Sequence, residues 1–518
     1  MSHFFNIKKK DIGYSRFGEI ECVHENVITP CYIPVVPFLD SSDDSIRTEN
    51  ITKSFPKKPG LSQVLLHNKD GKLSKSQKEK LSTKIHETHP QYEGALFLDS
   101  GGFKLIRMDI EDMPFKEVFD IQKDVGGDIF FTLDYPIIKD MPFPMQIKRA
   151  NKSLDNAIKA LQYRKDLWGT ATDKPIVYVA VHGTSTQFVR DYLEEFFRLL
   201  KKHDLEDVPF GFAHGSLVPL KHRRYLVLDF LYETKMVLKE KDMLDKVPIH
   251  AFGISGSLIP HLGLLGIDTF DSASYLLSAG NHQIFDPETL ETISFMEKED
   301  SVEKGKYCKR RGIDPTKFKN LKEAWGCDCM WCEKVKNAYP PAKENLVDFA
   351  RIIQRVVPQE GGWREDKDFL QYLKDRNFAF MDYLYVHMIC HNLTVTNNLV
   401  SKMHEHLRAG TYEGFFFDFL NKVHQGNSKK QVKQIRFLNS ILKDQPKFYD
   451  LAAKHVPQIK GRELLETNSS PKRPKLVDFK MDTSGIGLHP GKHKKAEKKI
   501  AAERRMKKEQ TYFEDDLL

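Results

Sequence analysis

The chain has 518 residues, of which 40% are hydrophobic, and a formal net charge of +8, so its length predicts two or three domains and a sizeable core. No apolar run approaches the ~20 residues that a membrane-spanning helix needs. The first ten residues lack the charged and then apolar order of a signal peptide, so we expect a cytoplasmic protein without a membrane partner. Seven cysteines, three of them clustered between 327 and 332, argue against a disulfide framework and favour a bound metal.

The first 300 residues show the pattern of an α/β protein. Residues 4–37 predict short entry strands, and residues 40–84 are mostly loop with at most one exposed helix. From residue 95 onward, short apolar runs alternate with amphipathic stretches, which is typical of a parallel sheet. These runs are 95–98, 129–133, 176–181, 208–213, 249–253 and 267–270. With an earlier strand at 32–36 and an eighth assigned to 292–296, they predict a (β/α)8 TIM barrel over residues 1–300.

The strand and helix alternation ends beyond residue 300. Long helical patterns follow at 344–356, 366–376, 379–407 and 432–443. We therefore expect a zinc-binding and helical subdomain over 301–460, followed by a linker and a basic tail over 461–518. Residues 492–508 hold nine Lys or Arg among seventeen, which suits contact with nucleic-acid phosphates, although such a run is also typical of a solvated tail.

Four of the apolar runs end in a polar residue. Asp99, Asp134, His182 and Asp271 each follow a predicted strand directly. A single Asp in that place is commonly the cap of the next helix. Catalytic groups of an α/β barrel, however, gather at the carboxyl ends of its strands. Four such residues together therefore predict an active site.

The three clustered cysteines have the spacing of a metal site. Cys327, Cys329 and Cys332 can reach one ion, and a structural zinc site needs four nitrogen or sulfur ligands. His387 and His391 lie four residues apart on one face of a predicted helix, so either can supply the fourth ligand. A closed tetrahedron leaves no position for a substrate, and we expect the zinc to be structural.

Several motifs together resemble the tRNA-guanine transglycosylase superfamily, and most of all its archaeosine-type branch. The similarity covers most of residues 15–335. Its most specific motif is Asp99-Ser-Gly-Gly-Phe103. The other segments that carry it are Arg16-Phe-Gly-Glu-Ile-Glu21, Val27-Ile-Thr-Pro-Cys-Tyr-Ile-Pro-Val35, Gly211-Phe-Ala-His-Gly-Ser-Leu-Val-Pro-Leu220 and Phe270-Asp-Ser-Ala-Ser-Tyr275.

This resemblance implies a guanine transglycosylase, a pentosyltransferase that exchanges a guanine for a 7-deazaguanine without cutting the polynucleotide. It implies that Asp271 is the nucleophile and that Asp99 is the general acid and then the general base. The residues implied to bind the base are Asp134, His182, Gly215, Ser216 and Phe103. The resemblance also matches His391, ahead of His387, to the fourth zinc ligand and implies no further cofactor.

The sequence departs from the family at three places near the expected base pocket. Lys104, His182 and His214 stand where the family pattern differs, and no counterpart of the archaeal RNA-binding domains is evident. We therefore expect DNA as the polymer, as in the 7-deazaguanine DNA transglycosylases, with 7-cyano-7-deazaguanine (preQ0) as the entering base and tRNA as the alternative polymer. A catalytically silent nucleic-acid-binding homologue and a small-glycoside hydrolase are the competing hypotheses. A helper protein or a homodimer is left open.

Overall fold

The computed structural model describes residues 4–39, 45–64, 79, 81–103, 114–138, 141–217, 220, 224–281, 283–294, 327, 329–333, 380–424, 428–442 and 445–455. Met1–Lys475 form one compact unit and Leu476–Leu518 a second. The predicted basic run at 492–508 and the helices predicted at 344–356 and 366–376 lie outside the described residues. The boundaries predicted near residues 300 and 460 also lie there and stay predictions.

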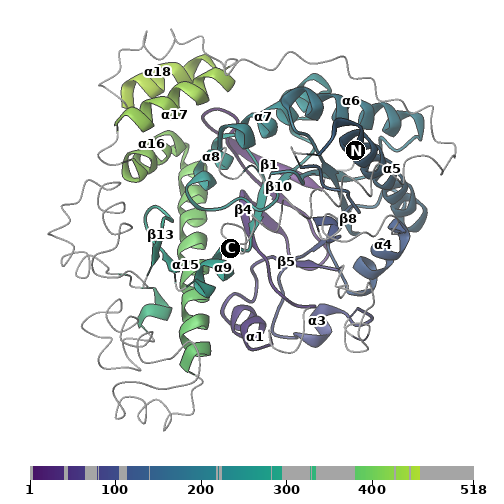
Figure 1. Cartoon of the computed structure of the whole chain (residues 1–518), viewed down its shortest axis with the longest axis horizontal. Helices are drawn as coiled ribbons and strands as arrows, with labels where there is room; N and C mark the ends of the chain where they lie inside the picture. The colour runs from purple at the N-terminus through teal and green to yellow at the C-terminus, as the bar shows by residue number, and fades with distance from the viewer. Residues whose placement is uncertain are drawn as a thin grey trace. The chain divides into compact units, whose positions relative to one another are not determined.

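Eight parallel strands form the barrel predicted from the sequence (Figure 1). In their order around the sheet they are β4 (Cys31–Pro34), β11 (Thr269–Ser272), β10 (Ile249–Ala251), β9 (Phe210–His214), β8 (Ile176–Val181), β7 (Ile129–Phe131), β6 (Leu96–Asp99) and β5 (Gly60–Gln63). The first and last strands meet through a parallel bridge between Val35 and Leu61 and a hydrogen bond of 2.7 Å from Val36 N to Leu61 O. This contact closes the barrel.

The predicted eighth strand was wrong. Its place in the barrel is taken by β5, within a stretch that we expected to be loop. Residues 292–294 form β13 (Thr292–Ser294), which pairs antiparallel with β12 (Gln283–Phe285) in a separate ribbon. β5 has a weak sequence signal because Gly60-Leu-Ser-Gln63 is short and half polar, so its extended conformation depends on its pairing with β6.

Helices pack around the strands, as Figure 1 shows. They are α1 (Ser45–Ser54), α3 (Ile85–Thr88), α4 (Phe115–Asp124), α5 (Phe143–Trp168), α6 (Thr186–Lys202), α7 (Arg224–Glu240), α8 (Ile259–Leu264) and α9 (Ser274–Gly280), with a short 3-10 turn at Gly256–Leu258. α5 and α6 are two of the amphipathic stretches expected between the strands. The Ser185 side chain caps α6 by accepting the Phe188 N–H at 3.2 Å, and the apolar face of α6 packs Phe196 against Phe212 of β9.

Aromatic rings fill the inside of the barrel. Residues alternate between the two faces of a strand, and Phe97, Phe131 and Tyr178 lie in contact within the barrel core. His250 of β10 joins them, with its ring centroid 4.9 Å from that of Phe131 and 4.7 Å from that of Phe252. The barrel interior is therefore a packed core, and the open end lies where the strands finish.

A three-stranded sheet closes the other end of the barrel. It consists of β1 (Phe5–Lys10), β2 (Arg16–Ile20) and β3 (Val27–Thr29). The buried Arg16 guanidinium donates to both carboxylate oxygens of Asp268, at 2.8 and 2.5 Å, and Asp268 also accepts the Ile249 N–H at 2.8 Å. This ion pair ties the small sheet to the amino ends of β10 and β11.

The helical segment after the barrel contains α15 (Phe380–Ala409), α16 (Tyr412–Val423), α17 (Ser428–Ile441) and α18 (Pro446–His455). The helices predicted at 379–407 and 432–443 correspond to α15 and α17. α15 lies beside α9 and β12 (Figure 1), and its His404 contacts Pro30 O at 2.7 Å. The Tyr412 hydroxyl donates to Pro260 O at 2.8 Å. Among the described residues no helix has the length and apolar character to span a bilayer.

Candidate active site and metal centre

A cavity of about 520 Å³ opens at the carboxyl ends of the barrel strands. Its walls include three carboxylates, Asp99, Asp134 and Asp271, which come from three different strand ends. Gly215 and Phe103 line it as well. The structure thus brings together the two predicted catalytic residues and three of the five predicted base-binding residues, as expected for the end of a barrel where loops carry the chemistry.

Asp99 ends β6 with its side chain directed into this cavity. The pKa of Asp99 is raised from 3.8 to about 7, first by burial and then by the neighbouring charges of Asp134 and Asp271. Hydrogen bonds from the Gly101 backbone and the Gln63 side chain act in the opposite direction, because they stabilise the ionised form. A carboxyl group in this environment can both donate and accept a proton near neutral pH.

Asp271 lies on β11 and is 6% exposed. Its Oδ1 accepts the Gly253 backbone N–H at 2.9 Å and lies 3.1 Å from Nε2 of His250. The other nitrogen of His250, Nδ1, lies 2.9 Å from the Thr269 hydroxyl. The two carboxylates predicted to be catalytic therefore have different surroundings: two hydrogen-bond donors surround one oxygen of Asp271, and two other carboxylates crowd Asp99.

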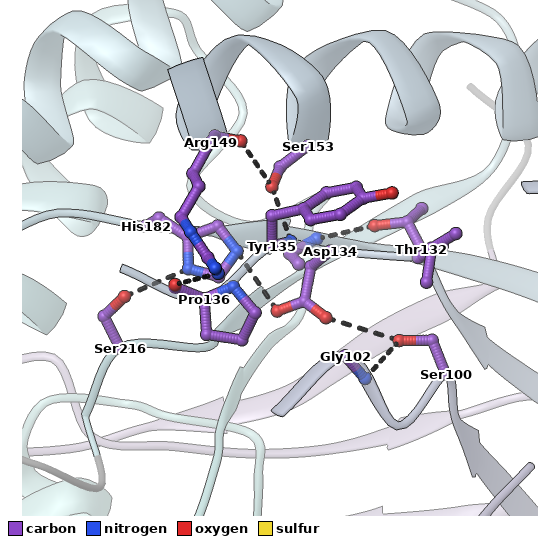
Figure 2. A network of polar contacts seen from close by, with 12 residues as sticks. Ser100, Gly102, Thr132, Asp134, Tyr135, Pro136, Arg149, Ser153, His182 and Ser216 are labelled. Carbon is purple, nitrogen blue, oxygen red and sulfur yellow. Dashed lines mark hydrogen bonds and ion pairs between the residues drawn. The ribbon is translucent and has the colours of Figure 1, made fainter. Parts of the chain in front are cut away.

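Figure 2 shows the polar contacts around Asp134. The Ser100 hydroxyl donates to Asp134 Oδ1 at 3.3 Å, and His182 Nε2 lies 3.2 Å from Asp134 Oδ2. Gly102 passes so close that a Cβ at this position would lie 1.9 Å from Oδ1 of Asp134. These contacts explain two residues of the motif Asp99-Ser-Gly-Gly-Phe103. Ser100 supplies a hydrogen bond to Asp134, and Gly102 leaves room for the Asp134 carboxylate.

His182 is fully buried and does not line the cavity. Its Nδ1 lies 3.0 Å from the Ser216 hydroxyl, while Nε2 faces Asp134 (Figure 2). A Cβ on Gly215 would lie 2.6 Å from Cε1 of the same ring. Both ring nitrogens thus face protein groups, which fits a residue that positions Asp134. Direct contacts of His182 and Ser216 with a base stay predictions.

His214 is directed away from the cavity. Alternation along β9 places Ala213 in the barrel core and His214 on the outer face, where Nε2 lies 2.7 Å from the Thr234 hydroxyl of α7. Burial lowers the pKa of His214 to about 3. The inference that His214 alters the base pocket was therefore wrong, and Lys104 lies outside the described residues.

Three residues of the site were not predicted from the sequence. Gln63 and Arg224 line the cavity, and His250 lies behind Asp271. His250 had a signal that went unused, since it is a polar residue inside the apolar run predicted at 249–253. Gln63 was hidden because β5 itself was not recognised. Arg224 carried no signal, since an exposed Arg at the start of a helix is common.

The four predicted metal ligands come together in the structure. The ligand atoms of Cys327, Cys329, Cys332 and His391 all lie within 4.8 Å of one another. The three sulfurs lie 3.5, 3.5 and 3.3 Å from Nδ1 of His391. Tetrahedral bonds of about 2.3 Å to sulfur and about 2.0 Å to nitrogen separate such ligand atoms by about 3.5 Å. The cluster therefore has the dimensions of a site that could hold a metal such as zinc.

The surroundings of His391 favour it over His387 as the fourth candidate ligand. His391 Nε2 lies 2.9 Å from Phe285 O, a contact that fixes the proton on Nε2 and directs the lone pair of Nδ1 at the three thiols. The next residue, Asn392, accepts the Phe285 N–H at 2.7 Å, which holds α15 against β12. His387 lies one helical turn away, with its ring centroid 6.4 Å from that of His391, and is not a member of the cluster.

Comparison with known proteins identifies the family. The model of the family described as "Queuine tRNA-ribosyltransferase" matches residues 11–342. The chain is also similar to three archaeal proteins named tRNA-guanine(15) transglycosylase. That of Thermococcus onnurineus is 27% identical over 297 residues, which are 57% of this chain and 46% of the relative. That of Pyrococcus abyssi is 26% identical over 300 residues, with the same shares. That of Nanoarchaeum equitans is 26% identical over 288 residues, covering 55% and 62%.

The chain spans about half the length of the first two relatives. The matched residues 11–342 include the closed barrel, all three cavity carboxylates and the three clustered cysteines. This chain belongs to the queuine tRNA-ribosyltransferase family.

Proposed function

We propose that the protein is a guanine transglycosylase that exchanges a guanine in tRNA for a 7-deazaguanine base. The main observation behind the proposal is that Asp99 and Asp271 line the same cavity in different environments. Carboxylates surround Asp99, whereas Asp271 accepts a backbone hydrogen bond. Exchange at a sugar carbon with retained stereochemistry requires one carboxylate as nucleophile and another group that transfers protons. Family membership supports the same assignment.

Asp271 is the proposed nucleophile. Its Oδ1 is held by Gly253 N–H and His250, so the carboxylate is fixed in one orientation toward the cavity. Attack on the anomeric carbon forms a covalent sugar–enzyme intermediate as the guanine leaves. A group with two fixed hydrogen bonds and little freedom to rotate begins the reaction already oriented.

Asp99 is the proposed proton donor to the departing guanine and the proton acceptor for the entering base. Its pKa of about 7 places both protonation states within reach at neutral pH, which suits a group that acts first as acid and then as base. Asp134, with Gly215 and Phe103, is proposed to bind the edge and face of the base. The hydrogen bond from Ser100 supports this role, because it restrains the orientation of the carboxylate, and His182 Nε2 lies 3.2 Å from the other carboxylate oxygen.

The choice of polymer rests on the comparisons. The sequence favoured DNA, partly through His214, which lies outside the cavity. The relatives are named for activity on tRNA, and they support tRNA, the alternative, over DNA. The stacked or folded guanine must be extruded to reach the cavity, at a cost of a few kcal/mol.

The test is incorporation of labelled guanine by the purified full chain. An unmodified tRNA transcript and a duplex DNA of matched guanine content are incubated separately with the enzyme. We expect label in the tRNA, and no incorporation with Asp271→Ala or Asp99→Ala. Label in the DNA alone would overturn the proposal for tRNA. No label in either polymer, with a folded protein, would support a silent nucleic-acid-binding homologue.

We also propose that the Cys3His cluster holds a structural zinc ion. The distances to His391 Nδ1 and the contact of Nε2 with Phe285 support zinc. A bound zinc ion would link the segment at 329–333 to α15 and so stabilise the packing of that helix against β12. Metal analysis of the purified protein is the test, with one zinc per chain expected.

A further inference from the structure

The two carboxylate oxygens of Asp271 have unequal surroundings. Oδ1 receives the Gly253 N–H at 2.9 Å and faces His250 Nε2 at 3.1 Å. No described residue hydrogen-bonds to Oδ2, while the side chain lines the cavity. Oδ2 is therefore the oxygen available to a substrate, and Oδ1 is the oxygen that the protein holds.

The orientation and tautomer of His250 are fixed from three sides. The ring is fully buried and packs against both Phe131 and Phe252, which also contact each other, so it cannot tilt without displacing an aromatic ring. Nδ1 lies 2.9 Å from the Thr269 hydroxyl, and that hydroxyl can donate to Nδ1. Nε2 then carries the proton and donates it toward Asp271. The opposite tautomer would direct a nitrogen lone pair at the carboxylate.

Thr269 and Asp271, the two polar residues that His250 contacts, lie on the same face of β11. Thr269 and Asp271 are two residues apart on β11, so their side chains point to the same face. Thr269 is the parallel neighbour of His250 on β10. One imidazole can therefore contact both residues without distorting either strand.

We propose that His250 is a positioning residue that holds Oδ1 of Asp271, directs Oδ2 at the anomeric carbon and assists cleavage of the Asp271–sugar bond in the second half of the exchange. This inference rests on the proposed function. It assigns a role to a residue behind the nucleophile, outside the set implied by the resemblance.

The reaction explains why the second half depends most on this contact. In the first half, Oδ2 bonds to the anomeric carbon, the glycosidic carbon–nitrogen bond breaks with its electron pair on guanine, and Asp99 supplies the proton. In the second half, a nitrogen of the entering base bonds to that carbon and gives its proton to Asp99. The carbon–Oδ2 bond breaks, and its electron pair returns to Asp271.

Negative charge therefore reappears on the Asp271 carboxylate as the intermediate breaks down. It spreads onto Oδ1, where His250 Nε2–H and Gly253 N–H donate. A hydrogen bond to a charged carboxylate is stronger than one to an ester carbonyl, so these donors favour the departure of the carboxylate. Loss of the His250 donor should slow breakdown of the intermediate more than its formation.

Two matched pairs of variants test this role. His250→Phe keeps a ring packed against Phe131 and Phe252 but has no donor, and His250→Gln restores an amide donor. Thr269→Val removes the hydroxyl that fixes the tautomer, and Thr269→Ser keeps it. The measurements are kcat and KM for labelled guanine exchange with an unmodified tRNA transcript, and the steady-state fraction of enzyme bound covalently to RNA on a denaturing gel.

We expect His250→Phe to lower kcat roughly 10- to 100-fold, the effect of losing one charged hydrogen bond. KM should fall as well, and the covalently bound fraction should rise above that of the wild type. His250→Gln should recover most of kcat. Thr269→Val should show a smaller change in the same directions, and Thr269→Ser should resemble the wild type.

A lower kcat in His250→Phe with an equal or smaller covalent fraction would overturn the inference, as would a failure of His250→Gln to recover activity. If melting curves show that His250→Phe is unfolded, the Thr269→Val and Thr269→Ser pair decides the question by the same two measurements. Absence of a covalent complex in the wild type, under conditions where Asp271→Ala is inactive, would instead refute the covalent mechanism of the proposed function.

Discussion

Replacing Asp99 by Asn should stabilise the folded protein at pH 8 and lose that effect toward pH 4. The raised pKa of Asp99, about 7 against an ordinary 3.8, means that the folded protein keeps this proton over a pH range in which the unfolded chain has released it. The stability that this proton contributes is present in full below about pH 4 and is lost as pH rises through 7. Above pH 7 the wild type carries a buried charge beside Asp134, and Asn carries none.

The size of the effect follows from the pKa shift. A change from 3.8 to about 7 corresponds to about 4 kcal/mol at ~1.4 kcal/mol per pH unit. Asp99 is partly exposed to the cavity, so solvent screening reduces this value, and we expect about 1–3 kcal/mol at pH 8. For a chain of this size the gain corresponds to a rise in melting temperature of about 1–3 °C.

The assay is thermal melting of the wild type and Asp99→Asn at a series of pH values between 4 and 8. Asp242→Asn is the control, because the Asp242 side chain is fully exposed, and its effect should be small at every pH. A gain for Asp99→Asn that does not change with pH, or a loss of stability at pH 8, would refute the inference that the cavity raises the pKa of Asp99. Activity should be lost in the same variant, which would make Asp99 a site where function opposes stability.

Three further predictions concern parts of the molecule away from Asp99. His391→Ala should lose the zinc and lower the melting temperature, while His387→Ala should keep one zinc per chain; equal metal content in both variants would contradict the ligand assignment. Arg16→Met should cost about 3–5 kcal/mol, because it leaves the Asp268 carboxylate buried without its partner; a loss below about 1 kcal/mol in denaturant unfolding would refute this. Deletion of residues 485–518 should weaken polynucleotide binding and flatten its dependence on salt, since fewer counterions are released; an unchanged slope would show that the basic run makes no phosphate contacts.

Sequence patterns were sufficient for most of the barrel and for the principal groups of its site. Seven of the eight strands had an apolar run long enough to recognise, and Asp99 and Asp271 followed from their places at strand ends. Both depend on local rules: a buried parallel strand must be apolar, and the residue after it emerges at the carboxyl end of the barrel. Clustered thiols likewise indicated a metal, because their spacing is set within one short segment.

Tertiary structure decided what no local rule specifies. β5 is extended because β6 on one side and Val35 and Val36, just after β4, on the other offer backbone partners. The segment Gly60-Leu-Ser-Gln63 alone does not reveal this. The period of two assigns His214 and Ala213 to opposite faces, but packing of α7 against β9 determines that the His214 face is the outer one. The pairing of β10 with β11 places His250 behind Asp271.

The choice between His387 and His391 also depended on tertiary structure. The two residues share one face of a helix, so helical periodicity does not separate them. Only the approach of β12, whose Phe285 O accepts from His391 Nε2, turns one imidazole toward the three thiols. The sequence thus determined which chemical groups the protein has available, and long-range packing determined which of them meet.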